Sequence, residues 1–577
     1  MYILGLNAYH ADSSAAIFKD GKMIVATEEE RFTRVKHWAG FPTLAVQFCL
    51  KEAGITLKDV DHIAIGRDPK AKLGRKVAYL LKNPGGGWNA VLDRLKNARK
   101  VASLEEEFHK IDPSVSKALI KKKIHQVEHH RSHLASAFFA SPFEEAALLS
   151  IDGSGDFTTT MIGIGKGNTI EVLDSVDFPH SVGLFYTAFT QLLGFPFYGD
   201  EYKVMGLAPY GNPLYVDQLK DVLVFKDNGL FELNLAYFRS AKSGIVSYGD
   251  DHIPVVAPLY SDYMVEKFGA VRKKDEPLNQ YHKDLAVSVQ RITEELIFHI
   301  LNHLQKRTGL KNVCIAGGVA QNSVANGKIT SNTGFKEVYI PSAGHDAGIS
   351  MGAALYVNNA VLKQPRQEAI WSAYTGSSFS NEEIESYLIS RDIPYTRYSD
   401  EQLFDVVSER LVNAGVIGWF SGRAEFGPRA LGARSILADP RRADAKDLLN
   451  AKIKRRESFR PFAPSILQEY VGEYFELNEP VPFMEKVFPI KKEKHSIIPA
   501  VTHVDGTGRL QSVLKSVSPK YYGLIEAFRQ KTGVPILLNT SFNENEPIVN
   551  SPEHALDCYL RTSMDMLVLE NCVVERK

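Results

Sequence analysis

The sequence is poor in cysteine, in net charge and in long apolar runs, and each absence excludes a class of protein. Its four cysteines form no CxxC pair, which argues against a zinc ribbon or a disulfide scaffold and fits a reducing cytoplasm. They are Cys49, Cys314, Cys558 and Cys572. Lysine plus arginine and aspartate plus glutamate both number 68, so no global field favours nucleic acid or a membrane surface.

Two further absences concern the cell compartment. No apolar run approaches the roughly 20 residues that a membrane helix needs. The first residues, Met1 to Asn7, read as a short strand without a basic region before it, so no secretory signal is visible and a cytoplasmic protein is expected. At 577 residues the chain is too long for one ordinary core, and two or more domains are expected.

A pair of histidines is the strongest local signal. His129 and His133 are four residues apart, a spacing that on a helix puts both imidazoles on one face, one turn apart. Converging neutral imidazoles are good ligands for a divalent metal. The alternative is a polar helix start whose histidines meet water or backbone, so the prediction of a metal site depends on ligands from elsewhere.

Two aspartates at strand ends are the candidates for those ligands. Asp152 follows a buried strand and precedes the small residues Gly153, Ser154 and Gly155, where backbone N–H groups approach an anion closely. Asp346 follows the strand 338–341. Carboxylates complete a mixed nitrogen and oxygen ligand set, although a plain Asp-Gly turn also explains the first of them.

The N-terminus and a diglycine suggest where a nucleotide binds. Residues 2–6, 15–18 and 23–27 read as three strands with a polar loop and a hairpin turn between them, an opening typical of actin-like ATPases. His10 lies in the polar loop, either as a functional group or as a turn former. Later, Gly317 and Gly318 separate a strand from an expected helix start at Asn322, a weak signal for a nucleotide cradle.

The second half of the chain concentrates arginine and lysine among glycine, proline and phenylalanine. We place a domain boundary in the loose stretch 363–378, which gives domains at 1–362 and 363–577. Arginine forks bind phosphates bidentately and lysine adds a point charge, so this density predicts a bound anion, against the alternative of a solvated basic face. The candidate residues are Arg429, Lys454, Arg460, Arg509, Asn539 and Ser541.

Three other stretches carry weaker expectations. Residues 28–37 mix acids and bases densely, and a solvated, salt-bridged segment is the usual explanation of such a run. Residues 69–125 are rich in lysine and arginine and read as mostly exposed helices inserted into the first domain, without an RNA-binding motif. The aromatic loop 194–211 reads either as part of a substrate cleft or as a packed surface loop.

Together these stretches resemble the nodulation-type O-carbamoyltransferases, a family that includes enzymes carbamoylating antibiotics such as tobramycin and cephamycin. The resemblance covers nearly the whole chain. It is carried by residues 28–37, 129–133, 150–156, 203–211, 316–322, 342–348, 426–435, 452–464 and 539–543. Each stretch alone is unspecific, whereas the set is highly specific.

The resemblance implies an α/β fold in two domains. The first is similar to the actin-like (ASKHA) tRNA threonylcarbamoyl-transfer proteins, and the second is similar to the YrdC-like fold that forms carbamoyl adenylate. It implies a metal held by His129, His133, Asp152 and Asp346, with iron as Fe(II) the expected ion. Two histidines and two carboxylates by themselves also admit zinc or manganese.

The resemblance further implies a two-step reaction in which carbamoyl phosphate and ATP, with Mg, form carbamoyl adenylate before transfer to a hydroxyl of a small molecule. Arg429, Lys454, Arg460 and Arg509 are expected to neutralise the phosphates, and Asn539 and Ser541 to hydrogen-bond the substrate. Asp152, Gly153, Ser154, Gly317, Gly318 and Asn322 are expected to hold the nucleotide in the first domain. His10 is the candidate that removes the acceptor's proton.

Other functions remain open at this point. An actin-like kinase explains the first domain but leaves the arginine-rich second domain without a role. A threonylcarbamoyl-type tRNA-modifying enzyme fits both domains, yet no tRNA-binding module or strongly basic balance is present. Neither nucleic acid nor a membrane is an expected partner. The acceptor and the oligomeric state, including a homodimer, are left open.

Overall fold

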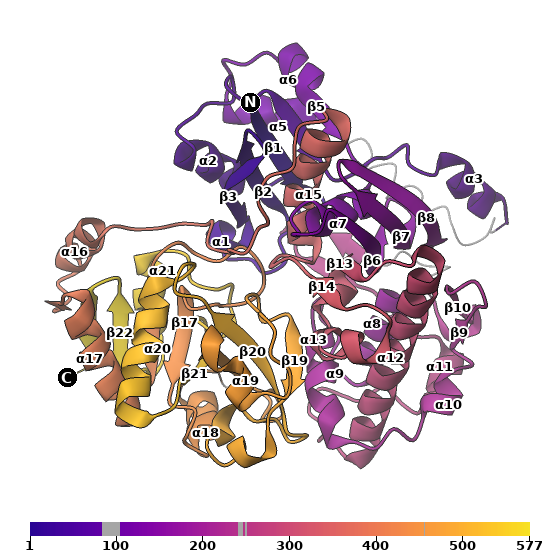
Figure 1. The fold of residues 1–577 in the computed structure, drawn as a ribbon. Helices are drawn as coiled ribbons and strands as arrows, with labels where there is room; N and C mark the ends of the chain where they lie inside the picture. The colour runs from indigo at the N-terminus through magenta and orange to yellow at the C-terminus, as the bar shows by residue number, and fades with distance from the viewer. Residues whose placement is uncertain (83–103, 240–245, 249–250, 455, 577) are drawn as a thin grey trace. The chain divides into compact units, whose positions relative to one another are not determined.

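The computed structural model describes residues 1–577 apart from 83–103, 240–245, 249–250, 455 and 577. The chain is mixed α/β and forms two compact units (Figure 1). The first unit comprises residues 1–322 and 329–370, and the second comprises 323–328 and 371–577. The chain therefore passes from the first unit to the second at Ile370, inside the loose stretch 363–378 and eight residues after the expected boundary. The excursion of residues 323–328 was not expected.

The first unit contains two five-stranded sheets with one strand pattern. The first sheet has the order β3-β2-β1-β4-β5. Its strands are β1 (Tyr2–Asn7), β2 (Ser14–Lys19), β3 (Lys22–Glu28), β4 (His62–Ile65) and β5 (Ile124–Gln126). The first three strands pair antiparallel as a meander, and β4 and β5 add parallel to β1. The expected opening of strand, loop, strand, hairpin turn and strand is therefore correct.

The second sheet repeats this topology. Its order is β14-β13-β6-β7-β8, with an antiparallel meander of β6, β7 and β8 and the parallel strands β13 and β14 beside β6. The strands are β6 (Glu145–Gly155), β7 (Thr158–Lys166), β8 (Thr169–Asp177), β13 (Asn312–Ala316) and β14 (Glu337–Tyr339). The central strand of each sheet is buried along most of its length, as expected for strands covered on both faces.

Two helices join the sheets of the first unit. Helix α15 (Ile349–Leu355) packs on β1, β2 and β4, whereas α7 (His129–Phe138) packs on β6 and β13, and the two helices pack on each other (Figure 1). Small residues allow this close approach. A Cβ atom at Gly352 of α15 would lie 1.9 Å from the Ser132 carbonyl oxygen of α7, and one at Gly5 of β1 would lie 1.9 Å from the Ser350 carbonyl oxygen.

Three charged residues of the stretch 28–37 are buried, so the expectation of a solvated segment is wrong for them. Glu28, Glu29 and Arg31 are each less than 5% exposed. Arg31 Nε donates to Glu28 Oε2 at 3.1 Å, and the Glu29 carboxylate accepts the backbone N–H groups of Leu44 and Ala45. Glu29 thus caps the N-terminus of α2 (Thr43–Glu52), where a carboxylate meets both free N–H groups and the positive end of the helix dipole.

The described residues of the stretch 69–125 form mostly helices, as expected, but only part of these residues is exposed. Helix α3 (Leu73–Lys82) exposes Leu73, Val77 and Leu81. In contrast, α5 (Leu104–Ile111) and α6 (Lys117–Lys123) bury Phe108 and Ile120 in the core of the first sheet. Residues 83–103 of this region, including its glycine-rich turn, lie outside the described residues.

The second unit is built on one nine-stranded sheet of order β15-β23-β22-β16-β17-β21-β18-β20-β19. Only the pairs β16/β22 and β18/β20 are parallel among its described pairings. The strands are β15 (Thr396–Arg397), β16 (Ile417–Phe420), β17 (Arg434–Ala438), β18 (Ala463–Leu467), β19 (Lys486–Pro489), β20 (Thr507–Val513), β21 (Ile536–Ser541), β22 (Met566–Leu569) and β23 (Cys572–Glu575).

The longer helices of this unit pack with the sheet around a large apolar core. They are α16 (Asn381–Ser390), α17 (Asp400–Val412), α20 (Pro519–Thr532) and α21 (Pro552–Arg561). The excursion of residues 323–328 forms the short helix α13 (Ser323–Asn326) beside β19, where Asn326 Nδ2 donates to the Glu485 carbonyl. Across the described residues, no helix is both long and apolar enough to cross a membrane.

The close contact between α7 and α15 predicts that a side chain at position 352 destabilises the protein. We expect Gly352→Ala to lower the free energy of unfolding by about 1–3 kcal/mol, because the new methyl group forces the helices apart at a backbone oxygen. Gly74→Ala in α3 is the matched control, since its Cβ would meet no atom within 4 Å. It should be neutral or stabilising by up to about 1 kcal/mol. Guanidinium denaturation of both variants measures the difference, and equal stabilities would contradict the close-contact argument.

Candidate metal centre and anion site

Helix α7 presents the histidine pair, as the spacing predicts. Glu128 is its N-cap residue, and its carboxylate accepts the N–H of Arg131 at 2.7 Å. The Asp156 carboxylate accepts the N–H of His129 at 3.0 Å, a second support for the helix start that the local pattern did not reveal. Because the helix begins at His129, both imidazoles project from its first two turns, with ring centroids 4.8 Å apart. Both side chains are buried.

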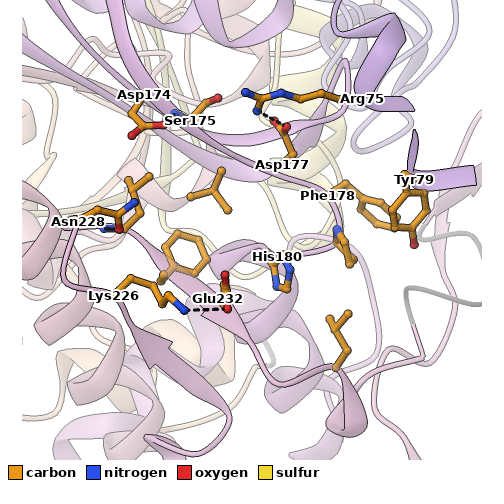
Figure 2. A pocket seen from close by; sticks show the side chains of 15 residues that line it. Arg75, Tyr79, Asp174, Ser175, Asp177, Phe178, His180, Lys226, Asn228 and Glu232 are labelled. Atoms are coloured by element: carbon orange, nitrogen blue, oxygen red, sulfur yellow. Dashed lines mark hydrogen bonds and ion pairs between the residues drawn. The ribbon is translucent and has the colours of Figure 1, made fainter. Parts of the chain in front are cut away.

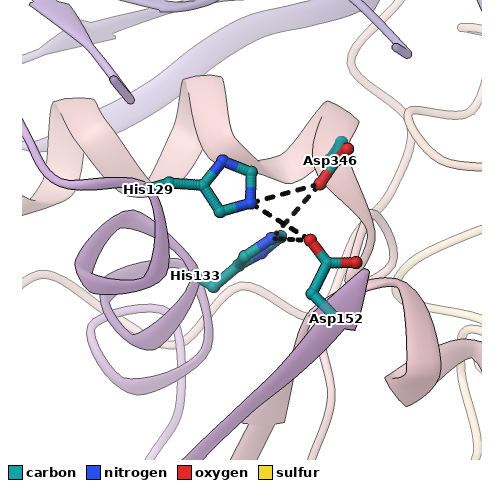
Figure 3. Close-up of side chains that lie close together, drawn as sticks. All are labelled: His129, His133, Asp152 and Asp346. Carbon is teal, nitrogen blue, oxygen red and sulfur yellow. Dashed lines mark hydrogen bonds and ion pairs between the residues drawn. The ribbon is translucent and has the colours of Figure 1, made fainter. Parts of the chain in front are cut away.

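The two aspartates meet these histidines. Asp152 comes from the buried strand β6, and Asp346 comes from the short 3-10 turn η4 (Asp346–Gly348) just before α15. Figure 3 shows His129, His133, Asp152 and Asp346 converging from three elements. One ligand atom from each of the four residues lies within 4.8 Å of the others, and all four residues are buried. The structure thus brings together the four predicted ligands.

The distances within this group are short. His129 Nε2 lies 3.1 Å from Asp152 Oδ2 and 3.6 Å from Asp346 Oδ1. His133 Nε2 lies 3.5 Å and 3.3 Å from the same two oxygens. We call these four side chains the metal-ligand cluster. Glycine is required beside it, because a Cβ atom at Gly155 would lie 2.1 Å from the His129 ring.

The charges of the cluster are those of a cation site. Burial alone raises a carboxyl pKa, but the adjacent imidazoles of His129 and His133 hold the pKa of Asp152 well below its usual value. The pKa of Asp346 is also lowered against burial and against Asp152, by His10 and His133. Burial lowers the pKa of His129, whereas the two carboxylates overcome burial and raise the pKa of His133 to about 9. Two buried carboxylates therefore stay ionised side by side.

Unsatisfied atoms show that the residues fit a metal ion. Among the described residues, Nε2 of His133 and Oδ1 of Asp346 have no partner in hydrogen-bond geometry although both are buried. Buried polar atoms are normally paired, and atoms left over at the point where two imidazoles and two carboxylates converge are ready to ligate a cation. The donor set of two nitrogens and two oxygens suits Fe(II), Zn or Mn.

His10 stands beside this cluster. Its Nδ1 lies 2.6 Å from Asp346 Oδ2, and its ring centroid is 5.1 Å from that of His129. Burial opposes protonation, yet the Asp346 carboxylate raises the pKa of His10 above its ordinary value. Ser14, the first residue of β2, is held to η4, since its Oγ donates to the Ala347 carbonyl at 2.6 Å. The polar loop between β1 and β2 thus brings His10 beside the metal-ligand cluster.

A second carboxylate and imidazole group lies on the same loop and was missed by the sequence argument. Asp12 Oδ1 is 2.8 Å from His37 Nδ1, and the Glu30 carboxylate accepts the N–H of His37 at 2.9 Å. Burial opposes the effect, but Asp12 raises the pKa of His37 to about 9. The signal was the dense charge of residues 28–37, which we interpreted as solvated.

The neighbouring His130 is a structural residue. Its ring contacts Ser150 Oγ at 2.8 Å and the Thr158 carbonyl at 3.0 Å, and it is fully buried. The pKa of His130 lies well below the ordinary value because the ring is buried and the imidazoles of His129 and His133 are close. His130 therefore stabilises the fold, whereas its neighbour His129 belongs to the metal-ligand cluster.

The diglycine region is arranged differently from a helix-start cradle. The chain after Gly317 forms a single 3-10 turn, η3 (Gly318–Gln321), and the N–H of Gly318 donates to Asp152 Oδ1 at 3.0 Å. Asn322 and Gln290 exchange two side-chain hydrogen bonds of 3.0 Å in a buried pair. Gly318 therefore orients a predicted metal ligand, and Asn322 is tied to α12 (Gln280–Thr308) rather than free to hold adenosine.

Gly153 and Ser154 follow Asp152 within β6, where the expected turn is replaced by strand. The Gly153 carbonyl accepts the Ser181 hydroxyl at 2.7 Å, at the N-cap of α8 (Val182–Leu192). A Cβ atom at Gly153 would meet no atom within 4 Å, so open space lies on that side of the strand. This leaves room for a ligand beside Asp152.

The second unit gathers the predicted cations. Arg429, Arg456 and Arg460 all act on Arg509, whose guanidinium pKa is lowered well below its usual value by burial and by these like charges. Among the described residues, Nε of Arg509 is buried without a hydrogen-bond partner. We call these four arginines the arginine cluster. Four crowded guanidinium groups fit a bound anion. Arg456 was not among the predicted site residues, although it lies in the predicted run.

Two other predicted residues, Lys454 and Asn539, are held by hydrogen bonds to neighbouring parts of the second unit. Lys454 is buried, and its ammonium lies within 2.7 Å of the Ser541 carbonyl and of both Asn543 oxygens, carbonyl and side chain. It therefore clamps the loop after β21 instead of presenting a free charge. The Asn539 amide donates to the Ala430 carbonyl and to Ser465 and Gln511, while its Oδ1 is buried without a partner among the described residues.

A separate cavity of about 470 Å³ lies in the first unit (Figure 2). It is lined by Arg75 and Tyr79 of α3, by Asp177 of β8, by His180 of the turn after β8 and by Glu232 of β10 (Phe231–Leu233). Two residues of the stretch 69–125 therefore line this cavity. None of the predicted site residues lines it.

Comparisons with known proteins bear on the whole chain. A family model described as carbamoyltransferase N-terminus matches residues 2–355, and one described as carbamoyltransferase C-terminus matches residues 408–576. An uncharacterised protein of Synechocystis sp. is 43% identical, over 100% of this chain and 97% of the relative. Nodulation protein NolNO of Sinorhizobium fredii is 38% identical over 99% of this chain and 80% of the relative.

Nodulation protein NolO of Bradyrhizobium diazoefficiens is 40% identical over 78% of this chain and 79% of the relative. Among solved structures, the Acidaminococcus fermentans (R)-2-hydroxyglutaryl-CoA dehydratase component A aligns with a TM-score of 0.32 and 16% identity, covering 63% of this chain and 99% of that one. HypF of T. kodakarensis aligns with a TM-score of 0.29 and 13% identity, covering 63% and 48%. Scores this low support no conclusion about the fold.

The metal-ligand cluster predicts metal content. We expect the double variant His129→Ala, His133→Ala to lose the metal that co-purifies with the protein, because only two carboxylates would remain of the four ligands. The matched control is His62→Ala with His125→Ala, a contacting histidine pair in the same unit whose side chains do not belong to the cluster. Elemental analysis measures both. Equal metal content in the two double variants would refute this ligand assignment.

Proposed function

The chain belongs to the carbamoyltransferase family, and we propose that it is an O-carbamoyltransferase that forms carbamoyl adenylate from carbamoyl phosphate and ATP. The carbamoyl group then passes to a hydroxyl of a small-molecule acceptor, a natural product or a sugar. The observation that carries this proposal is the pairing of two dissimilar sites in one chain. One is a buried cluster of two imidazoles and two carboxylates, and the other is a cluster of four arginines.

We assign the first unit to the actin-like (ASKHA) fold. The support is internal, since two sheets share one topology of a three-stranded meander extended by two parallel strands. Such a duplication leaves a nucleotide site between two related halves. The second unit is assigned the role of a YrdC-like adenylate-forming domain, which is supported by the arginines and the polar side chains of β18, β20 and β21.

The first step is proposed for the arginine cluster. Atom balance requires one water, because hydrolysis of carbamoyl phosphate yields carbamate and phosphate. A carbamate oxygen then attacks the α-phosphorus of ATP, forming the adenylate P–O bond as the bond to pyrophosphate breaks. Every participant is anionic and the anions repel one another, so Arg429, Arg460 and Arg509 contribute by neutralising them. Magnesium would accompany ATP.

The transfer step is proposed for the metal-ligand cluster. A divalent ion held by His129, His133, Asp152 and Asp346 would neutralise the adenylate's phosphate and polarise its carbamoyl group. The acceptor oxygen attacks the carbamoyl carbon, the bond to the AMP oxygen breaks, and the hydroxyl proton goes to His10. The Asp346 carboxylate, 2.6 Å away, stabilises the imidazolium that His10 becomes.

One product separates this proposal from its alternatives. Carbamoyl adenylate formation releases pyrophosphate from ATP, whereas an actin-like-fold kinase releases ADP. A threonylcarbamoyl-type tRNA-modifying enzyme also releases pyrophosphate but requires bicarbonate, threonine and tRNA in place of carbamoyl phosphate. Incubation of the whole chain with ATP and carbamoyl phosphate alone therefore distinguishes the three.

The two sites predict separable half-reactions. We expect Arg460→Ala to reduce pyrophosphate release from ATP and carbamoyl phosphate by at least about 100-fold, because a guanidinium at a crowded anion site cannot be replaced by water. His129→Ala should leave that release nearly unchanged and abolish carbamoyl transfer. Arg442→Ala is the control, since this arginine pairs with Asp444 on the surface of the same unit. Loss of the first step in both site variants would disprove the division of labour.

A further inference from the structure

His503 lies in the turn just before β20 (Thr507–Val513), the strand that contains Arg509. Its backbone N–H donates to the Thr507 carbonyl at 2.8 Å, and the N–H of Gly506 donates back to the His503 carbonyl at 2.9 Å. This closed turn leads directly into β20, where Arg509 follows two residues after Thr507. The turn thus holds His503 close enough to Arg509 for the arginine's charge to act on the imidazole. It was not among the predicted site residues.

A chain of hydrogen bonds fixes the tautomer of His503. The Thr507 hydroxyl lies 2.7 Å from Asp505 Oδ1 and 3.2 Å from His503 Nδ1. A hydroxyl has one proton, and an ionised carboxylate only accepts, so that proton goes to Asp505. The Thr507 oxygen can then only accept from the imidazole. Nδ1 therefore carries the proton, and a neutral His503 has its lone pair on Nε2.

The surroundings keep this ring neutral. Burial, together with the positive charges of Arg509 and Lys446, lowers the pKa of His503 to about 4 against the opposing effects of Asp505 and the Phe462 carbonyl. At neutral pH an uncharged hydrogen-bond acceptor therefore sits among cations. A lysine or arginine at this position would only donate hydrogen bonds, whereas the neutral imidazole of His503 also accepts one.

The lone pair has no partner of its own. Among the described residues, His503 Nε2 is buried and makes no hydrogen bond of good geometry, and the same is true of the Arg509 Nε donor. Buried acceptors and donors are costly unless something pairs with them. A ligand that satisfies both atoms offers an anionic oxygen to the arginine and an N–H or O–H group to the histidine.

We propose that His503 Nε2 accepts a hydrogen bond from the carbamoyl N–H of the donor substrate and so selects carbamoyl phosphate over acyl phosphates. This inference rests on the proposed function. Carbamoyl phosphate and acetyl phosphate present the same phosphate to the arginines, but one has an amino group where the other has a methyl group. Only the amino group satisfies the lone pair.

The test compares the two phosphates on the whole chain. We measure kcat/KM for pyrophosphate release from ATP with carbamoyl phosphate and with acetyl phosphate, and the inhibition constant of acetyl phosphate against carbamoyl phosphate. His503→Phe keeps a flat ring but removes the lone pair. Its preference for carbamoyl phosphate should fall by at least about 10-fold, with tighter acetyl phosphate inhibition, because no acceptor is then left unpaired.

Three further variants test the hydrogen-bond chain itself. Thr507→Val removes the hydroxyl that fixes the tautomer and should reduce the preference in the same direction, whereas Thr507→Ser should retain it. His495→Gln is the matched control in the same unit, since its ring nitrogen contacts the Ile490 carbonyl. It should leave the preference unchanged. If His503→Phe does not fold, the Thr507 pair decides.

The outcomes separate the inference from the function on which it rests. If His503→Phe slows both phosphates equally, or lowers kcat without altering the preference, the histidine acts as a general base or as a packing residue, and the inference is overturned. Equal preferences in Thr507→Val and Thr507→Ser would overturn it as well. A wild-type chain that releases no pyrophosphate with carbamoyl phosphate contradicts the proposed function itself, and the inference falls with it.

Discussion

Two ionised carboxylates, Asp152 and Asp346, are held side by side in a buried place, and the first unit is built around that constraint. Their mutual repulsion is balanced by His129, His133 and His10. The three elements that supply the ligands must meet closely, which the glycines of β6 and α15 permit. Burying two like charges costs free energy unless a cation binds to them. The close contact between α7 and α15 and the binding of a cation therefore depend on each other.

The second unit gathers positive charges where the first unit gathers negative ones. Arg429, Arg456 and Arg460 lower the proton affinity of Arg509, whose buried Nε has no hydrogen-bond partner among the described residues. Lys454 holds the loop after β21, so its ammonium is occupied by carbonyl and side-chain oxygens of that loop. The neutral His503 adds an acceptor among these donors. Such a mixture discriminates between ligands of equal charge, which arginines alone do not do.

Sequence reasoning succeeded where the signal was local. The spacing of His129 and His133, and the strand ends at Asp152 and Asp346, predicted residues that the fold brings together, and the family resemblance is confirmed. It failed where partners are distant in sequence. Asn322 pairs with Gln290, Lys454 with residues almost 90 positions away, and Glu29 with the backbone of α2. A charge pattern cannot distinguish water from such partners.

The two sites cannot be merged, and this explains why the chain needs two units. A cluster of ionised carboxylates attracts a metal ion and repels free phosphates, whereas a cluster of arginines binds phosphates and would pair with those carboxylates if they were adjacent. In the proposed reaction, activation of carbamate takes place in the second environment because its reactants are anions. The proposed transfer from the adenylate calls for an electrophile and a proton acceptor, which the arginines do not provide. A step that uses clustered carboxylates and a step that uses clustered arginines therefore require two separate sites.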